Sequence, residues 1–370
     1  MTCRFCRAEA GSLVLDLGQQ PACDNFPDAA DPGPDFEYPL EMWLCSACGL
    51  AQLMADPTMP EEPAGTEPAA LVAQAADAVA RIAGSGLLPA GGRVAEYGSP
   101  HGGSWLDLLG ARGVTPVADG QAADVVLDCF GMMHAADQHA ALAQRTARVA
   151  PGGVLLMQFH SLGAILRGGQ WNALRHGHYA YYSVTALTRM LAVHGFTPRT
   201  AWTFELYGGT VLLAASRDGE PDASVRALLA GDLSDGIGDP AVLGRLHSDM
   251  MDQAAGLREF LESQRAAGQP TLGYGAASRA VALLRRAGAD RTLLPAIVDA
   301  SAAKHGRRMP GTDIPIAAPG RLAEARPAAM VLFLADLLPE VRAAYPEVEA
   351  AGGRWVSADS LASRRLEQRS

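Results

Sequence analysis

Two pairs of cysteines near the start of the chain have the spacing of a metal site. Cys3 and Cys6 are separated by two residues, as are Cys45 and Cys48, and the chain has 6 cysteines in total. Four thiolates brought together in this way suit Zn²⁺, which binds sulfur at about 2.3 Å in closed tetrahedral sites that stabilise a fold. Two disulfides or solvated thiols are the alternatives. Cys23 has no close cysteine neighbour and is expected to pack in the core.

A glycine-containing turn further along the chain has the form of a ligand-binding turn. Glu96, Gly98 and Gly102 lie at the end of a predicted strand and in the turn after it, and a predicted helix follows. Glycines let the backbone approach a ligand closely, and a helix start aims N–H groups at it. The pattern resembles the turn that holds S-adenosylmethionine in methyltransferases, although similar turns occur in many α/β proteins. Asp119, after the next predicted strand, is the candidate for binding the ribose hydroxyls of that cofactor.

Basic residues gather at one place in a chain that is acidic overall. The sequence has 30 Lys and Arg against 40 Asp and Glu, a formal net charge of −10, which argues against general affinity for nucleic acid or anionic membranes. Arg279 opens a predicted helix after a glycine turn, and Lys304, Arg307 and Arg308 surround Gly306 on a predicted loop. Cations beside a helix N-terminus form an anion site, so these four side chains are candidates for binding an anionic group such as a phosphate. The alternative is an ordinary solvated surface loop.

The rest of the sequence indicates a globular α/β protein, with a zinc-binding module followed by two Rossmann-like domains. The 370 residues are 49% hydrophobic with a mean hydropathy of +0.06, enough for two or three domain cores. Neither a secretory pattern nor a run of about 18 apolar residues is present, so a cytoplasmic protein is expected. Strands are predicted at 93–98, 114–118, 124–129, 153–159, 209–215, from 271, and at 295–299, 329–333 and 354–356, with helices at 71–82, 104–111 and through 218–266. The expected domains are 1–57 (zinc-binding module), 58–216 (methyltransferase-like domain), 217–269 (helical connector) and 270–370 (C-terminal Rossmann-like domain).

The order of these features resembles the sugar C-methyltransferases of deoxysugar biosynthesis, a family of natural-product and antibiotic pathways. The resemblance covers nearly the whole chain and includes the cysteine module and both glycine turns. Its other motifs are more specific together than any one alone. They are Pro21-Ala22-Cys23-Asp24-Asn25-Phe26, the stretch ending at His134, 175–183 (RHGHYAYYS), 304–311 (KHGRRMPG) and 312–316 (TDIPI). The chain is accordingly identified as a divergent and shortened member of this family.

The resemblance implies an enzyme that binds structural zinc and S-adenosylmethionine and methylates a nucleotide-linked keto-sugar or a related small molecule. In such a reaction a ketone acidifies the neighbouring C–H bond, a base removes the proton, and the enolate attacks the methyl group of the cofactor. Histidine suits the base because its unperturbed pKa lies near working pH. His178 matches the proposed base of the family and His134 a second histidine on the substrate side, while Tyr182 is expected to line the substrate site. A monomer or homodimer is expected.

Two departures from the family pattern lead to alternative hypotheses. Arg175-His176-Gly177-His178 stands where the family usually has Tyr-His-Glu-His, so the phenol and the carboxylate beside the base are absent. Between Gly98 and the strand at 124–129 the chain is too short for two complete crossover units of about 30 residues each, so one βα unit is missing. The second hypothesis is a repurposed member with cofactor-independent acid/base chemistry, such as epimerisation, elimination or cyclisation. The third is a non-catalytic binding or scaffold protein.

Overall fold

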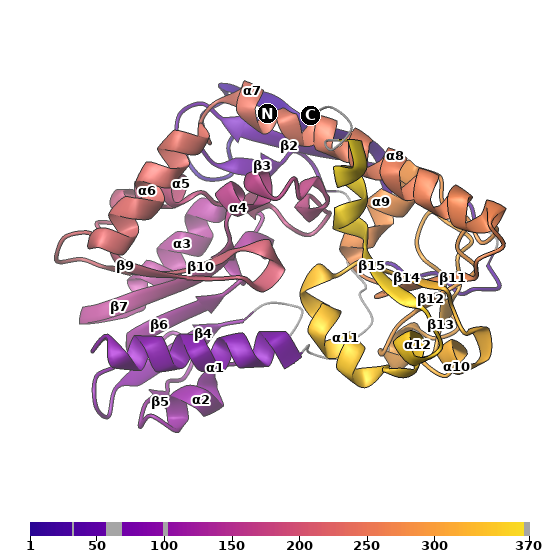
Figure 1. Ribbon diagram of the computed structural model, residues 1–370. Coiled ribbons are helices and arrows are strands. Elements are labelled where there is room, and N and C mark those ends of the chain that lie inside the picture. Colours follow the sequence, from indigo (N-terminus) through magenta and orange to yellow (C-terminus); the bar gives the residue numbers. More distant parts are fainter. Residues whose placement is uncertain (32, 57–68, 99–102, 366–370) are drawn as a thin grey trace.

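The computed structural model describes residues 1–31, 33–56, 69–98 and 103–365, which form two lobes bridged along one edge by helices (Figure 1). The lobe from the middle of the chain is built on a six-stranded sheet, and the C-terminal lobe on a five-stranded sheet. A four-stranded sheet made mostly by the N-terminal residues accompanies them. The predicted α/β class is confirmed.

The N-terminal sheet is antiparallel and takes one strand from a distant part of the chain. β1 (Gly11–Pro21), β2 (Glu37–Cys45) and β3 (Ala51–Leu53) pair in sequence order, and β8 (Ala180–Tyr181) then pairs with β3. β1 buries Leu15 and Leu17, which are two residues apart and so lie on one face of the strand. Because β8 comes two residues after His178, this sheet also anchors the predicted catalytic segment.

The middle sheet has the strand order β5-β4-β6-β7-β10-β9. The first four of these strands are parallel, whereas β10 runs antiparallel to both β7 and β9. The sequence predicts every strand except β9, which lacks a clean alternation of buried and exposed residues. The bounds are β4 (Arg93–Tyr97), β5 (Thr115–Pro116), β6 (Ala123–Cys129), β7 (Val149–His160), β9 (Thr197–Phe204) and β10 (Thr210–Ser216).

The sheet is shortened on the side of β5, as the spacing predicts. From β4 the chain passes through the short helix α2 (Leu106–Gly110) to β5, and it then returns directly to β6 on the other side of β4. β5 has only two residues, both exposed. In the part of the chain that the structure describes, no further strand pairs with β5, so one βα unit is absent at this edge.

Helices cover both faces of the middle sheet. α1 (Ala69–Gly84) confirms the predicted helix and packs Ala78 and Ile82 in one cluster with Val125 and Leu127 of β6. The intervening Val126 belongs to the cluster on the opposite face, as the two-residue period of a strand requires. Figure 1 shows α1 and α2 below the sheet and α3, α5 and α6 above it. The other elements of this lobe are α3 (Gln138–Ala147), α4 (Leu162–Arg167), α5 (Val184–Val193) and α6 (Ala223–Asp235), with 3-10 turns η1 (Met132–His134), η2 (Trp171–Ala173) and η3 (Leu206–Gly208).

The C-terminal lobe has a parallel sheet in the order β13-β12-β11-β14-β15. Its first strand leads through a glycine turn into α9 (Ser278–Ala287), which confirms the predicted strand, turn and helix. The strands are β11 (Thr271–Tyr274), β12 (Ile297–Val298), β13 (Ile316–Ala317), β14 (Ala329–Leu332) and β15 (Arg354–Ser357). The remaining elements are α10 (Arg321–Ala325), α11 (Leu338–Ala344) and α12 (Glu347–Ala350), with η4 (Ala302–Lys304), η5 (Ala335–Leu337) and η6 (Ala358–Arg365).

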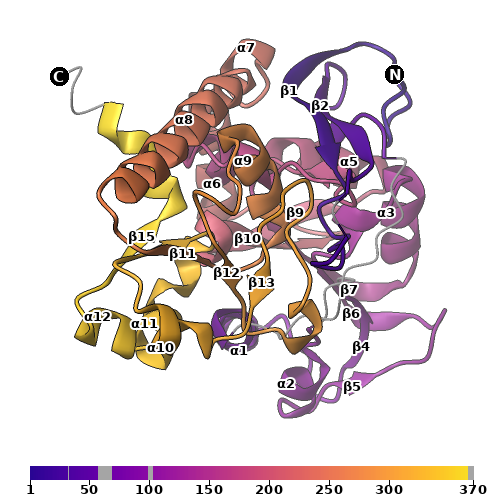
Figure 2. The ribbon, with the colours of Figure 1, turned by 90° about the vertical axis from the view of Figure 1, so that its right-hand side faces the viewer.

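One hydrophobic core joins the N-terminal sheet to the C-terminal lobe. It contains Leu15 and Leu17 of β1, Leu257 of α8 (Arg245–Ala266) and Leu283 of α9. Figure 2 shows α9 with α8 on one side and the N-terminal strands on the other. The short α7 (Pro240–Leu243) completes the predicted helical stretch. None of the helices in the described ranges is long and apolar enough to cross a membrane.

Candidate active site and metal centre

The structure brings the four predicted cysteine ligands together. Cys3 and Cys6 flank a tight turn before β1, Cys45 ends β2, and Cys48 lies in the turn that leads to β3. All four sulfur atoms lie within 4.8 Å of one another, and the Cys3–Cys48 and Cys6–Cys45 Sγ distances are 3.7 and 3.6 Å. A tetrahedral zinc with bonds of about 2.3 Å requires sulfur–sulfur distances of about 3.8 Å. The donor set and its geometry therefore fit zinc.

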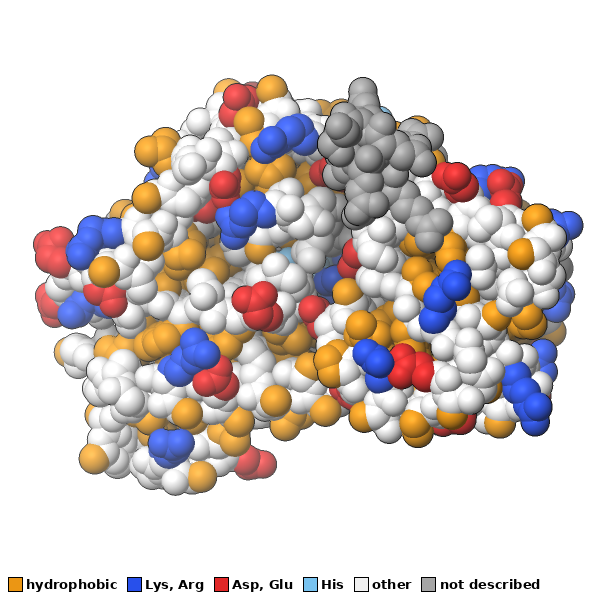
Figure 3. All heavy atoms as spheres, viewed as in Figure 1, with side chains coloured by type: hydrophobic (Ala, Val, Ile, Leu, Met, Phe, Trp, Pro, Cys, Tyr) orange, Lys and Arg blue, Asp and Glu red, His pale blue; other side chains and the backbone are white. Residues whose placement is uncertain are grey.

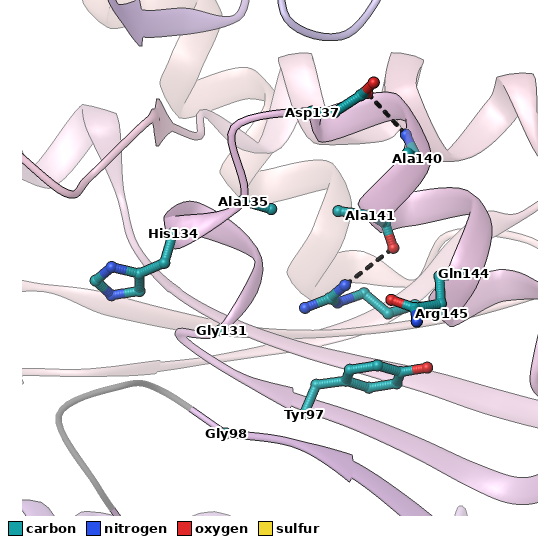
Figure 4. A pocket seen from close by; sticks show the side chains of 10 residues that line it. All are labelled: Tyr97, Gly98, Gly131, His134, Ala135, Asp137, Ala140, Ala141, Gln144 and Arg145. Atoms are coloured by element: carbon teal, nitrogen blue, oxygen red, sulfur yellow. Dashed lines mark hydrogen bonds between the residues drawn. The ribbon is translucent and has the colours of Figure 1, made fainter. Parts of the chain in front are cut away.

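An open pocket lies where β4 and β6 end, at the carboxyl edge of the parallel part of the middle sheet. Its volume is ≈ 680 Å³. Gly131 is required at its base, because a Cβ there would lie 2.8 Å from the carbonyl oxygen of Gly98. The ends of strands in such sheets are where nucleotide-type ligands bind. The lining residues, drawn in Figure 4, are Tyr97, Gly98, Gly131, His134, Ala135, Asp137, Ala140, Ala141, Gln144 and Arg145.

Two of the predicted cofactor residues, Glu96 and Gly98, lie at this end of β4. The Glu96 carboxylate accepts hydrogen bonds from Ser104 Oγ at 2.6 Å and from the Trp105 N–H at 2.7 Å, and so ties the strand to the start of α2. Gly98 lines the pocket itself. Asp119 is exposed in the turn after β5, and Gly102 lies outside the described residues. Glu96 and Gly98 thus share the site, while Asp119 stands at the shortened edge of the sheet.

A buried ion pair between Asp128 and Arg145 lies next to the pocket. Asp128 at the end of β6 accepts a hydrogen bond from Arg145 Nε at 2.5 Å and another from the Met132 N–H at 3.0 Å. Burial raises the pKa of Asp128, although the charge of Arg145 opposes this effect. The Arg145 guanidinium also lies 4.3 Å from the centre of the Tyr97 ring, as Figure 4 shows. Asp128 therefore fixes the turn that carries His134.

The two predicted catalytic histidines are neighbours. The rings of His134 and His178 are perpendicular, with centroids 4.7 Å apart. His134 Nδ1 lies 2.9 Å from the Gly177 carbonyl oxygen, and because a carbonyl only accepts, this nitrogen carries the proton. A neutral His134 then has its lone pair on Nε2. The histidine pair borders the pocket through His134.

Arg175 contacts this histidine pair from the same loop, a contact that local sequence patterns did not predict. Its Nε donates to His178 Nε2 at 2.8 Å, so His178 also has its lone pair on Nε2. The far end of the guanidinium hydrogen-bonds Ser278 Oγ at the start of α9. Arg175 thus joins the two lobes next to His178. Because Ser278 is distant in sequence, no spacing rule could have paired these residues.

Of the four cations predicted to bind phosphate, three join the domains to each other. Lys304 Nζ lies 4.7 Å from the centre of the Phe26 ring, and Arg307 donates to the Phe26 carbonyl oxygen at 2.7 Å. Arg308 is buried and forms a two-pronged ion pair with Asp35 at 2.6 and 2.7 Å. The structure gives these three side chains contacts that dock the N-terminal module, and their role in binding phosphate stays a prediction. Arg279 instead lies beside the ring of Tyr207.

Tyr182 does not line the substrate site. Its side chain is buried, and its hydroxyl donates to Gln138 Oε1 within the core of the middle lobe. Burial raises the pKa of the Tyr182 hydroxyl well above its ordinary value. The predicted substrate contact is therefore corrected to a packing role. The sequence could not separate the two because a tyrosine suits both core packing and a pocket wall.

Comparison with known proteins defines the class of this enzyme. A zinc binding domain model matches residues 3–61, a methyltransferase domain model residues 69–201, and a C-methyltransferase C-terminal domain model residues 205–358. C-methyltransferase NovU of Streptomyces niveus is 24% identical over 398 residues, covering 96% of this chain and 94% of that protein. The protein is thus a methyltransferase with a zinc-binding domain. More narrowly, the chain resembles the S-adenosylmethionine-dependent C-methyltransferases over almost its whole length.

Solved structures resemble parts of the chain. Magnesium protoporphyrin IX methyltransferase (ChlM) from Synechocystis PCC 6803, with bound SAH, is 15% identical with a TM-score of 0.29, covering 40% of this chain and 83% of that chain. The 1,6-didemethyltoxoflavin-N1-methyltransferase of Burkholderia thailandensis, with bound 1,6-didemethyltoxoflavin and S-adenosylhomocysteine, is 17% identical with a TM-score of 0.31, covering 47% and 96%. At these TM-scores the assignment rests on the family models and the curated relative. They favour methyl transfer over the cofactor-independent and non-catalytic hypotheses.

Proposed function

We propose that this protein transfers a methyl group to a carbon atom next to a ketone in a nucleotide-linked sugar or a related small molecule. The observation that carries the proposal is the histidine pair beside the pocket at the end of β4, with ring centroids 4.7 Å apart. S-adenosylmethionine, when bound, supplies the electrophilic methyl group. Glu96, Gly98, Gly102 and Asp119 are the residues proposed to hold it.

In this proposal the histidines remove the proton that makes the substrate carbon nucleophilic. His178 is the base and His134 stands beside it on the pocket wall, and a neutral ring of either has its lone pair on Nε2. The Gly177 carbonyl orients His134, and Arg175 orients His178. A base positioned in this way contributes typically 10² to 10⁴ in rate.

The test uses the zinc-loaded chain with methyl-labelled S-adenosylmethionine and a panel of nucleotide-linked keto-sugars. The expected product carries the label on carbon, which NMR distinguishes from methyl on oxygen or nitrogen. Label on oxygen or nitrogen would contradict the proposal, as would failure to bind the cofactor.

A second measurement isolates the proton transfer. With S-adenosylhomocysteine bound, the wild-type protein in D₂O should exchange the acidic C–H of its substrate without methylating it. His178→Gln and His134→Gln should slow this exchange, whereas His247→Gln, an exposed histidine on α8, should not. Undiminished exchange in both site variants would remove the histidines from the mechanism.

A further inference from the structure

Two arginines meet beside the histidine pair, one from each lobe. Arg175 hydrogen-bonds His178 and reaches Ser278, the first residue of α9. Arg279 is the next residue of that helix, and its guanidinium carbon lies 5.5 Å from the centre of the Tyr207 ring. Figure 3 shows the face between the lobes hollowed, with basic and histidine side chains at the bottom of the hollow. Through the contacts of Arg175, the start of α9 that carries Arg279 lies next to the histidine pair.

Arg279 has no hydrogen-bond acceptor among the residues that the structure describes. The carboxylates of Asp336 and Asp359 act on it only through their charge, without an ion pair. Asp336 instead accepts the backbone N–H groups of Tyr207 and Gly208, and Asp359 accepts from a glutamine. A guanidinium has five N–H donors in a planar fork that fits a carboxylate or phosphate. The arrangement thus leaves Arg279 available for an anionic ligand.

The surroundings show that positive charge is concentrated here. Burial, together with the charges of Arg279 and Arg175, lowers the pKa of His160 to about 3. Burial and the charge of Arg175 likewise lower the pKa of Arg279. A bound anion would relieve the repulsion between the two guanidinium groups.

The backbone next to the arginines is strained. Tyr207 and Phe130 both adopt left-handed conformations, with φ of 56° and 58°, and their rings lie 6.1 Å apart. Left-handed backbone is unfavourable in bulky residues and gathers at ligand sites. The strained pair forms the aromatic wall against which the Arg279 guanidinium lies.

We propose that the substrate carries an anionic oxygen group, a carboxylate or a phosphate ester, beside the reacting carbon, and that Arg279 and Arg175 bind it. The inference rests on the proposed function, because it places this group next to the base. An anion bound by Arg175 also competes with His178 for the same guanidinium, and so uncovers the Nε2 lone pair. Arg175 and Arg279 then determine which keto compounds the enzyme accepts.

The test is calorimetric titration of the full, zinc-loaded chain saturated with S-adenosylhomocysteine, using malonate and inorganic pyrophosphate as separate probes. Wild type should bind at least one probe, and Arg279→Gln should weaken that binding about tenfold or more, the cost of losing a charged hydrogen bond. Arg286→Gln is the matched control, because it removes the same charge from the exposed end of the same helix. It should bind like wild type.

The outcomes separate the ligand sources and the two proposals. Binding of malonate only identifies a carboxylate, and binding of pyrophosphate only identifies a phosphate. Binding of neither probe to the wild type, or equal binding by Arg279→Gln and wild type, overturns the inference. Saturation of each variant with S-adenosylhomocysteine reports an intact fold. If the wild type does not bind S-adenosylhomocysteine but, titrated without it, still binds the anion through Arg279, the proposed methyl transfer is refuted and the anion site stands.

Discussion

The ion pair between Arg308 and Asp35 holds the C-terminal lobe to the N-terminal module, and we expect Arg308→Gln to destabilise the protein. Two guanidinium nitrogens reach two carboxylate oxygens, and the side chains are only 5% and 14% exposed. The Gly311 N–H donates to the same carboxylate at 2.6 Å. The substitution therefore leaves a largely buried carboxylate with a single donor.

The expected loss follows from the burial of both partners. Removing one partner of a buried pair costs about 3 to 5 kcal/mol, and the partial exposure of Asp35 favours the lower end, about 3 kcal/mol. With an unfolding entropy of about 2.1 cal/mol/K per residue, a 370-residue chain loses about 4 °C in its melting midpoint. The control is Arg285→Gln, whose ion pair with Glu37 also joins the lobe to the module. Those side chains are 46% and 31% exposed, so that loss should stay below about 1 kcal/mol.

The difference between wild type and Arg308→Gln should also depend on pH. Burial acts to raise the pKa of Asp35, but the hydrogen bonds from Arg308 and Gly311 outweigh it and hold the pKa below its ordinary value. A carboxyl whose pKa is lowered by folding stabilises the folded state at pH values above the unfolded pKa of about 3.9. This stabilisation is lost as the pH falls through the pKa of the carboxyl in the folded state. Melting curves at neutral and acid pH measure both effects. Equal midpoints for Arg308→Gln and Arg285→Gln would refute the reasoning.

Three further expectations concern the metal, the base and the cofactor pocket. Cys3→Ser should lose bound zinc and melt at a lower temperature, because a structural metal contributes to folding; unchanged zinc content by atomic absorption would sink the metal assignment. His178→Gln should lower turnover by about 10²-fold or more at unchanged melting temperature, while His247→Gln keeps wild-type turnover; equal rates would argue against the base. Gly131→Ala should weaken S-adenosylhomocysteine binding, since its Cβ would press within 2.8 Å of the Gly98 carbonyl oxygen. Gly110→Ala meets no atom within 4 Å and should bind normally; equal affinities in calorimetry would place the cofactor elsewhere.

The features that the sequence predicts well are those encoded over a few residues. The spacing of Cys3 and Cys6, and of Cys45 and Cys48, reflects the tight turns that aim their sulfur atoms at one point. The middle strands follow from short apolar runs bounded by turns, and the missing βα unit follows from a simple count of chain length before β6. Local geometry fixes all of these, so no knowledge of the packed molecule is needed.

The features that the sequence does not predict depend on how the lobes pack. Lys304, Arg307 and Arg308 form a basic cluster in sequence, yet Asp35 and the backbone after β1 engage that cluster from a distant segment. The contact of Arg175 with Ser278 arises in the same way. Charge patterns show where cations gather, but only the folded chain shows which of them already have partners.

The pairing of β8 with β3 connects the metal centre to the catalytic loop. β3 follows Cys48 after a short turn, and β8 begins two residues after His178. The paired strands β3 and β8 therefore connect the four sulfur atoms to the segment of His178. We therefore expect that loss of the metal would loosen β3, and with it the β8 strand next to His178. A chelator should then reduce activity at concentrations that leave the six-stranded and five-stranded sheets folded. In that case the zinc site would control the position of the loop that carries His178.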